Sequence, residues 1–326
     1  MIETTSKAVH NISDTDLLEM KEMDEKHSAC LKFYTFMAIV SFFAKPNMLA
    51  FLACRMITLT MRHGICKYSI MGITQYAAVK ASSTKTKDIQ QASRLGKAAV
   101  SCLKKRFHST EGVAQVPMVY LSYYCLTAFH TEKLQFCANM LRQGFDVGMS
   151  VGDSTTAFLN SAQHIKTSFI AGEKLPILLE QLDYYLKLSD QYKNKLVNMY
   201  LLIFRDTISA LIDRGKSTSL NTNSSSNENG VKTSPHASGA INFHRALQAF
   251  WLGHNDRCQY FLVKVLQSRS VTAKLGNIVA MFIHGLNSFQ LLKRQDTIKL
   301  RAIPKSALRV LKAASSHSEW NFRNKV

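Results

Sequence analysis

Apolar residues recur at intervals of three and four along most of this 326-residue chain, in consecutive segments of helical length. This spacing places the apolar side chains on one face of a helix. In residues 88–107 that face is formed by Ile89, Ala92, Leu95, Ala99, Cys102 and Leu103. Residues 175–190 repeat the pattern with leucine and tyrosine. The periodicity therefore predicts α-helices along almost the whole chain.

Short breaks separate the periodic segments. The 14 glycines and 5 prolines are too few for a sandwich or barrel of many short strands. The breaks predict helices at 14–26, 31–43, 47–62, 65–80, 88–107, 113–129, 131–149, 153–171, 175–190, 192–213, 240–252, 255–272, 274–293 and 304–315. Taken in pairs, these helices recur roughly every 40 residues, the period of helical-hairpin repeats. We therefore expect an all-α fold of stacked helical hairpins, a tetratricopeptide-like solenoid.

The chain divides by composition into four parts. Residues 1–46 are N-terminal helices, and 47–212 are helical-hairpin repeats. Residues 213–239 are rich in Ser and Asn, with too little apolar surface to order themselves, so they predict a flexible low-complexity linker. Residues 240–326 are C-terminal helical repeats.

Glycines occupy several of the breaks. A glycine just after a helix adopts the left-handed conformation without strain, and we expect this at Gly64, Gly112, Gly152 and Gly172. Asp153 offers a capping oxygen to the helix that follows it. Before Gly64, Arg62 and His63 fall in a last helical turn, where positive charge favours the helix dipole. A hairpin corner thus accounts for this tripeptide without chemistry.

One segment approaches a phosphate-binding loop. Gly215, Lys216 and Ser217 follow the required order, but Ala210 stands where the first glycine belongs. The preceding residues have helical rather than strand spacing, and a low-complexity stretch follows instead of a helix. We therefore predict no nucleotide site here.

Other catalytic and metal-binding patterns are missing from the sequence. His63, His108, His130, His164 and His244 stand alone, without a second ligand at helical spacing. The sequence contains no nucleophile elbow, kinase loop or dinucleotide fingerprint. These observations predict a non-enzymatic chain without cofactor or metal.

Charge points to an anionic or acidic partner. The formal net charge is +19, and such an excess attracts nucleic acid, anionic lipid or acidic proteins. The spacing of four basic residues near the C-terminus puts them on one face of a helix: Arg301, Lys305, Arg309 and Lys312. This face can track phosphates, or it can be a solvated surface that meets an acidic neighbour.

Cysteine usage and the N-terminus bear on location. Seven scattered cysteines, odd in number and without a CxxC pair, suggest a reducing compartment. Residues 1–26 lack the apolar core of a signal peptide. The most apolar run, residues 33–44, is too short to cross a bilayer as a helix. We expect a soluble, cytoplasmic chain with no transmembrane segment.

The order of several short motifs resembles a known family from about residue 30 onward. Residues 59–64, with Ser69 and Tyr76, form an apolar helix ending in glycine and then a Ser- and Tyr-bearing helix. Further matching motifs are Leu95-Gly96-Lys97-Ala98 with Phe107, Gly144 with Gly152-Asp153 and Ala157, Phe169 with Gly172, Leu175, Tyr184 and Tyr185, Trp251-Leu252-Gly253 to Asp256, and Glu319-Trp320-Asn321-Phe322. Together they resemble the helical, tetratricopeptide-like segment of large AAA-type ATPase and multi-sensor signal-transduction kinase proteins.

The resemblance implies a role rather than a reaction. The kinase and ATPase modules of that family lie outside these residues, so no catalytic residue is implied here. It implies a turn at Gly253 and a scaffold or regulatory module for signal transduction, with kinase or ATPase domains as protein partners in cis or in trans. The basic charge and the 213–239 insertion depart from the family. The alternative is a nucleic-acid or anionic-membrane binding protein that uses the C-terminal Lys/Arg face.

Overall fold

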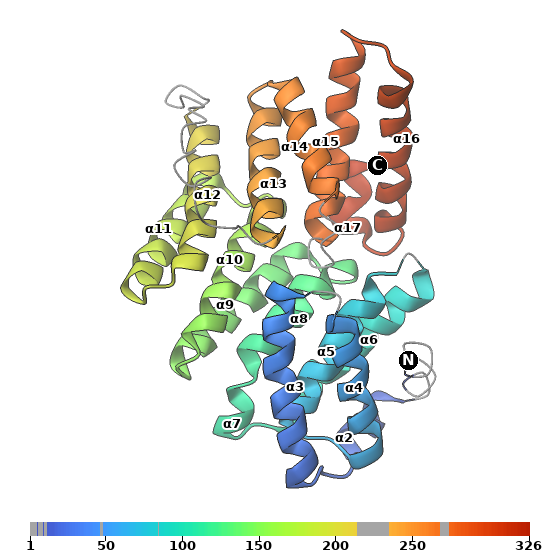
Figure 1. Cartoon of the computed structure of the whole chain (residues 1–326), viewed down its shortest axis with the longest axis vertical. Helices are drawn as coiled ribbons and strands as arrows, with labels where there is room; N and C mark the ends of the chain where they lie inside the picture. Colours follow the sequence, from blue (N-terminus) through green and yellow to red (C-terminus); the bar gives the residue numbers. More distant parts are fainter. Residues whose placement is uncertain are drawn as a thin grey trace. The chain divides into compact units, whose positions relative to one another are not determined.

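The computed structural model describes Thr5, Val9 and residues 12–45, 48–83, 85–213, 235–267 and 274–326. The described residues are overwhelmingly helical and contain no β-strand, which confirms the predicted all-α class (Figure 1). The one β-like contact is an isolated bridge between Glu22 and Ile65. Contacts divide the chain into two compact units, Met1–Thr167 and Ser168–Val326.

The first unit is built from consecutive helices that pack on their neighbours in sequence, as hairpins do. Its elements are α2 (Asp14–Glu19), α3 (Glu25–Ala44), α4 (Met48–His63), α5 (Lys67–Ala81), α6 (Thr86–Arg106), α7 (Thr110–Val113), α8 (Val116–Leu126), the 3₁₀ helix η1 (Ala128–His130), α9 (Leu134–Ser150) and most of α10 (Ser154–Ile170).

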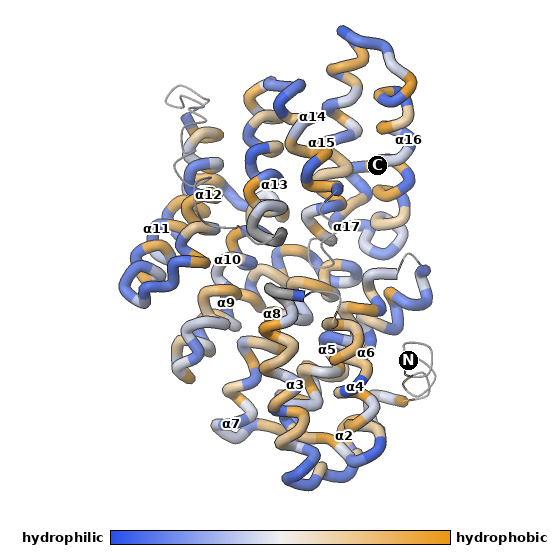
Figure 2. The backbone as a smooth tube through the Cα atoms, in the orientation of Figure 1, coloured by the Kyte–Doolittle hydropathy of each residue, from blue (hydrophilic) through white to orange (hydrophobic). Residues whose placement is uncertain are grey.

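Helix α5 is the central element of the first unit. All residues from Ser69 to Ala77 are buried, and α5 packs against α3, α4, α6 and α8. A helix enclosed on every side needs no polar face, which is why its amphipathic pattern is weak. Figure 2 shows α6 by contrast as a helix of mixed polar and apolar residues.

The second unit continues the same construction. Its helices are α11 (Leu175–Gln191), α12 (Lys195–Ile212), α13 (Pro235–Trp251), α14 (Asn255–Gln267), α15 (Lys274–Leu292), α16 (Ile298–Ser315), α17 (Glu319–Phe322) and the 3₁₀ helix η4 (Arg323–Lys325). Each helix from α11 to α15 packs against the next helix in the chain. Buried residues of α13, α14 and α15 share one apolar cluster, which includes Leu247, Leu262 and Ile283.

The first predicted helix is wrong in its extent. The prediction ran from residue 14 to 26, whereas α2 ends at Glu19 and α3 begins at Glu25. A new helix starts after Asp24, because the Asp24 carboxylate accepts a hydrogen bond from the His27 backbone nitrogen at 3.0 Å and so caps the N-terminus of α3.

Gly112 is not a left-handed cap. It lies inside α7, and its φ is not among the positive values found at four other glycines. An added Cβ would lie 2.0 Å from the Phe107 carbonyl oxygen, so close backbone approach is what excludes a larger side chain there. The predicted helix 113–129 correspondingly divides into the end of α7, then α8 and η1.

Two later helices begin earlier than predicted. Helix α13 starts at Pro235, so residues 235–239 of the predicted linker are helical. Helix α16 starts at Ile298 rather than 304, with Thr297 capping the Leu300 nitrogen at 3.3 Å. Pro304 therefore lies inside the helix, where it donates no backbone hydrogen bond. The rest of the predicted linker, from 214 to 234, lies outside the described residues.

Candidate functional site

The predicted basic face is on the exposed side of α16. Ala307, Leu311 and Ala314 are buried on the opposite side of the helix. All four predicted cations are exposed: Arg301, Lys305, Arg309 and Lys312. Arg301 binds Asp296, with its Nε 2.6 Å from Oδ1. This contact leaves three cations on the face without an ion pair to any carboxylate in the described part of the chain.

A groove of about 930 Å³ lies among α11, α12, α13 and α14 of the second unit. Basic side chains line it at Lys193, Lys195, Arg245 and Lys264, against two carboxylates, Asp190 and Asp206. Burial raises the pKa of Asp206 despite the neighbouring positive charge of Arg205. The groove is therefore polar, with an excess of positive charge, and the sequence did not indicate it because four separate helices supply its lining.

Two of the cations that line this groove also contact aromatic rings. The Lys264 ammonium lies 4.3 Å from the ring centre of Tyr260, and the Arg245 guanidinium lies 5.8 Å from that of Phe261. Such cation–π contacts hold the cationic groups over flat apolar surfaces. The groove itself, with more basic than acidic side chains in its lining, suits an anionic ligand.

Helix α3 carries an exposed apolar stripe. Phe33, Phe36 and Val40 are 63%, 57% and 64% exposed, at helical spacing of three and four residues. Their neighbours Leu31 and Ala38 are fully buried on the other side of the helix. Helix α4, which packs on α3, adds further exposed apolar area at Met48 and Phe51. Contiguous apolar surface of this kind is typical of interaction sites.

Apart from Gly112, the glycines predicted at turns have the expected left-handed backbone conformation. Positive φ values occur at Gly64 (106°), Gly152 (81°), Gly172 (86°) and Gly253 (78°). Asp153 accepts a hydrogen bond from the Thr156 nitrogen at 3.1 Å and caps α10. These residues shape corners between helices, and the structure does not bring them together into one site.

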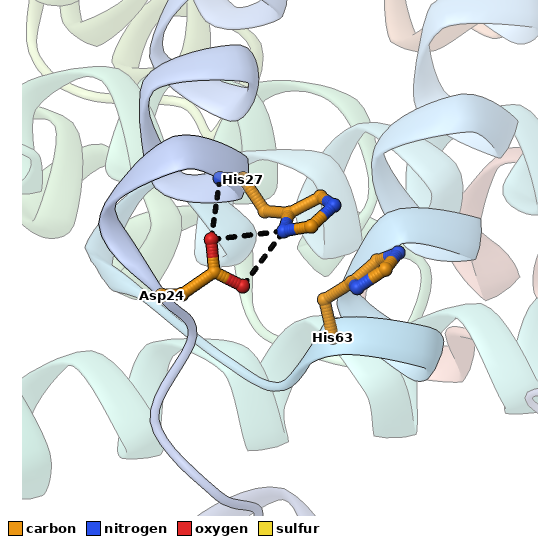
Figure 3. Close-up of side chains that lie close together, drawn as sticks. All are labelled: Asp24, His27 and His63. Carbon is orange, nitrogen blue, oxygen red and sulfur yellow. Dashed lines mark hydrogen bonds and ion pairs between the residues drawn. The ribbon is translucent and has the colours of Figure 1, made fainter.

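His63 does not stand alone, contrary to the sequence-based expectation. Its ring stacks on that of His27, with ring centres 3.5 Å apart and planes inclined by 13°. The His27 Nδ1 lies 2.7 Å from Asp24 Oδ2 (Figure 3). One potential ligand atom from each of these three residues lies within 4.8 Å of the others. The 36-residue separation of His27 and His63 conceals the pair from any search at helical spacing.

Several of the other histidines and cysteines are core residues. Burial, with a smaller effect of Arg142, lowers the pKa of His164 to about 4. Burial raises the pKa of Cys137 and of Cys258 to about 12. Thiols with such values carry almost no thiolate near neutral pH, so they pack as small apolar groups. His130 and His244 are also buried, whereas His108 is exposed.

The remaining predicted site residues, Gly215, Lys216 and Ser217, lie outside the described residues. Within the described helices, the segment Leu275–Leu292 of α15 is long and apolar enough to cross a membrane, and 61% of it is buried inside the structure. Length and composition of this kind are shared by core helices of water-soluble proteins. Comparison with protein-family models, curated proteins and solved structures finds no match to this chain.

Proposed function

We propose that this chain is a non-catalytic helical scaffold that binds other proteins. The observation that carries the proposal is the exposed apolar stripe of Phe33, Phe36 and Val40 on α3. Exposed apolar side chains at helical spacing form the complementary surface that an amphipathic partner helix needs. Burial of a large apolar side chain contributes about 1.5–3 kcal/mol, so three such residues supply substantial binding free energy.

Charge narrows the class of partner. The chain carries 41 Lys and Arg against 22 Asp and Glu, which favours encounter with an acidic surface. We infer a partner whose docking helix has one apolar face and acidic flanks. The resemblance to the helical segment of signal-transduction ATPase–kinase proteins further suggests kinase or ATPase domains, in cis or in trans, with catalysis residing in those domains.

Quantitative pull-down with the full chain tests the proposal. The bait variants are Phe36→Glu/Val40→Glu, which place charge on the stripe, and Ile298→Glu, which changes an apolar side chain that is 87% exposed at the start of α16. We expect proteins bound by the wild-type chain to be lost with the stripe variant and retained with Ile298→Glu. Mass spectrometry of the bound fraction then shows whether kinase or ATPase domains are enriched.

Two results would contradict the proposal. One is the absence of any protein bound above background. The other is equal retention by the wild-type chain and the stripe variant, provided that circular dichroism shows both to be folded. Enrichment of bound proteins without kinase or ATPase domains would retain the scaffold and exclude the suggested partner class.

A second candidate function, the binding of nucleic acid or anionic membrane, is favoured by the unpaired cations of α16. Lys305, Arg309 and Lys312 share one exposed face without ion pairs to the described residues. Phosphate binding through three cations predicts a steep fall of affinity with salt, with a log–log slope of about −2 to −3. Titration of single-stranded RNA, duplex DNA and anionic vesicles at several salt concentrations measures that slope. Changing all three residues to Gln should abolish the salt-dependent binding. If binding by the wild-type chain does not depend on salt, this function is excluded.

A further inference from the structure

We propose that Asp24, His27 and His63 form a binding site for a divalent transition-metal ion, with Zn²⁺ as the ion that best fits the ligands. Two imidazoles and a carboxylate are the ligand set of many three-residue zinc sites, in which water completes a tetrahedral coordination. Asp24 and His27 come from the start of α3, and His63 is the last residue of α4. The site therefore joins two helix ends that are far apart in the sequence.

The three ligand atoms lie within 4.8 Å of one another, close enough for one ion after the side chains adjust. Zinc binds imidazole nitrogen at about 2.0–2.1 Å, so two nitrogens on one tetrahedral ion are about 3.4 Å apart. The ring centres of His27 and His63 are 3.5 Å apart and their planes are nearly parallel, while one nitrogen of each ring lies within 4.8 Å of the other. Both rings must therefore turn out of the stack for their in-plane lone pairs to point at one ion. Asp24 Oδ2 and His27 Nδ1 are 2.7 Å apart and must separate by roughly 0.7 Å to hold zinc between them. Rotation about the last side-chain bond of each residue, which has a broad energy minimum, allows this change.

Helix capping explains only part of the cluster. The Asp24 carboxylate caps α3 through the His27 backbone nitrogen and also contacts the His27 ring. Neither contact requires a second imidazole. His63 nevertheless stacks on the His27 ring, although it comes from the end of another helix. A metal ion bound by all three side chains would account for the presence of His63 next to Asp24 and His27.

The surroundings permit a metal ion to enter and bind. The His27 side chain is 28% exposed and that of Asp24 57% exposed, so the site opens to solvent. Lys26 and Arg62 are the nearest cationic residues in sequence, and both are exposed, which leaves their charges screened by salt. Figure 3 shows the Asp24 carboxylate and the two rings gathered at the junction of α3 and α4.

The backbone around the site is held in place before any metal binds. The Met23 nitrogen donates to the Ile65 carbonyl at 3.1 Å, and the Ile65 nitrogen donates to the Lys21 carbonyl at 2.9 Å. These two hydrogen bonds fix the strand-like segment before α3 next to the segment after α4. A site whose backbone is already fixed loses less conformational entropy on binding, because only its side chains need to reorient. Zinc bound here would further stabilise the junction, since it binds the folded chain in preference to the unfolded one.

Thermal denaturation with and without ZnCl₂, together with calorimetric titration, tests the proposal on the full chain. The parent carries Cys30→Ser, because Cys30 is an exposed thiol and thiolates are zinc ligands that would complicate the titration. The main variant is Asp24→Asn, since Asn caps helices as well as Asp does but lacks the charge. His63→Gln is the second variant, and His108→Gln, an exposed histidine elsewhere in the first unit, is the control.

We expect one zinc ion per parent chain and a rise in Tm on zinc addition, both retained in His108→Gln. Asp24→Asn and His63→Gln should each weaken zinc binding by at least about tenfold and lose the rise in Tm. The proposal would be overturned if zinc did not change the Tm of the parent chain. It would also be overturned if all four proteins bound zinc with equal affinity. If His63→Gln does not fold, the comparison of zinc binding by Asp24→Asn and by the parent still tests the proposal. Co²⁺ in place of Zn²⁺ gives an independent readout, because tetrahedral N/O ligands produce visible d–d bands without thiolate charge-transfer absorption.

Discussion

Two glycines in this chain adopt the same left-handed backbone conformation in different surroundings. Gly64 and Gly152 both have positive φ, at 106° and 81°. A Cβ at Gly64 would lie 2.4 Å from the Lys21 carbonyl oxygen, whereas a Cβ at Gly152 would meet nothing within 4 Å. The strain of a left-handed backbone is thus common to both sites, and the steric conflict is specific to Gly64.

This contrast predicts unequal effects of alanine. Gly152→Ala should lower the free energy of unfolding by about 1 kcal/mol, the cost of positive φ in a residue with a Cβ. Gly64→Ala should lower it by about 2 kcal/mol or more, because the Lys21 backbone must also move. Urea denaturation of both variants measures the difference. Equal losses would show that the carbonyl contact has no energetic effect.

The buried His164 predicts a dependence of stability on pH. Its pKa is about 4 in the folded chain, against 6.5 for a histidine in water, so between these values the unfolded chain binds a proton that the folded chain does not. The free energy of unfolding therefore falls as pH decreases from 6.5 towards 4, by about 2 kcal/mol between pH 7 and pH 5. His164→Gln should remove that part of the slope in urea denaturation.

The exposed His108 supplies the control for this experiment. Its side chain is exposed in the folded chain, so His108→Gln is a matched His-to-Gln change at a position that folding does not bury. If His164→Gln retains the full wild-type slope between pH 7 and pH 5, the imidazole does not remain neutral on folding.

At the scale of helices, small residues set how closely neighbours approach. Gly96 of α6 faces Tyr123 of α8, and a Cβ at Gly96 would lie 2.3 Å from the Tyr123 ring. The ring is 2% exposed and its hydroxyl donates to the Ser93 carbonyl at 3.4 Å. The ring therefore fills space that any side chain at position 96 would occupy.

Gly96→Ala should consequently lower the free energy of unfolding by about 1–2 kcal/mol. Overpacking costs about 1–3 kcal/mol, which exceeds the gain of up to about 1 kcal/mol from better helix propensity. In a Tyr123→Leu background the space is larger, so the same substitution should become neutral or stabilising. Chemical denaturation of this double-mutant cycle gives the coupling. Additive effects would mean that the ring does not restrict position 96.

For the whole molecule, the net charge of +19 is itself a source of instability. Like charges on a compact chain repel one another, and salt screens the repulsion. Raising the salt concentration from about 0.01 M to about 0.1 M shortens the Debye length from about 30 Å to about 10 Å. We expect Tm, measured by circular dichroism, to rise by a few degrees over this range.

A variant with fewer charges tests the cause of that rise. Changing Lys305, Arg309 and Lys312 to Gln removes three exposed cations from α16 and should reduce the salt response. A Tm that falls with salt in the wild-type chain would indicate that its ion pairs outweigh the repulsion.

Helix positions were largely predictable because burial imposes a local pattern. The predicted helix 175–190 differs from α11 by one residue, and 274–293 from α15 likewise. The errors occur where the period persists across a break, as at Asp24, or where a helix begins before a proline, as α16 does at Ile298 ahead of Pro304. The family resemblance, the scaffold role and the cytoplasmic location remain predictions.

The sequence by itself determined the all-α class, the helices and the exposed basic face of α16, since each follows from the spacing of residues within one segment. Only the tertiary structure decided that His63 meets His27 and Asp24, that four helices enclose a basic groove, and that Gly112 is needed for close approach rather than for its φ. The physical reason is that helical periodicity reports which side of a helix is buried, while the identity of the neighbour depends on how the helices pack.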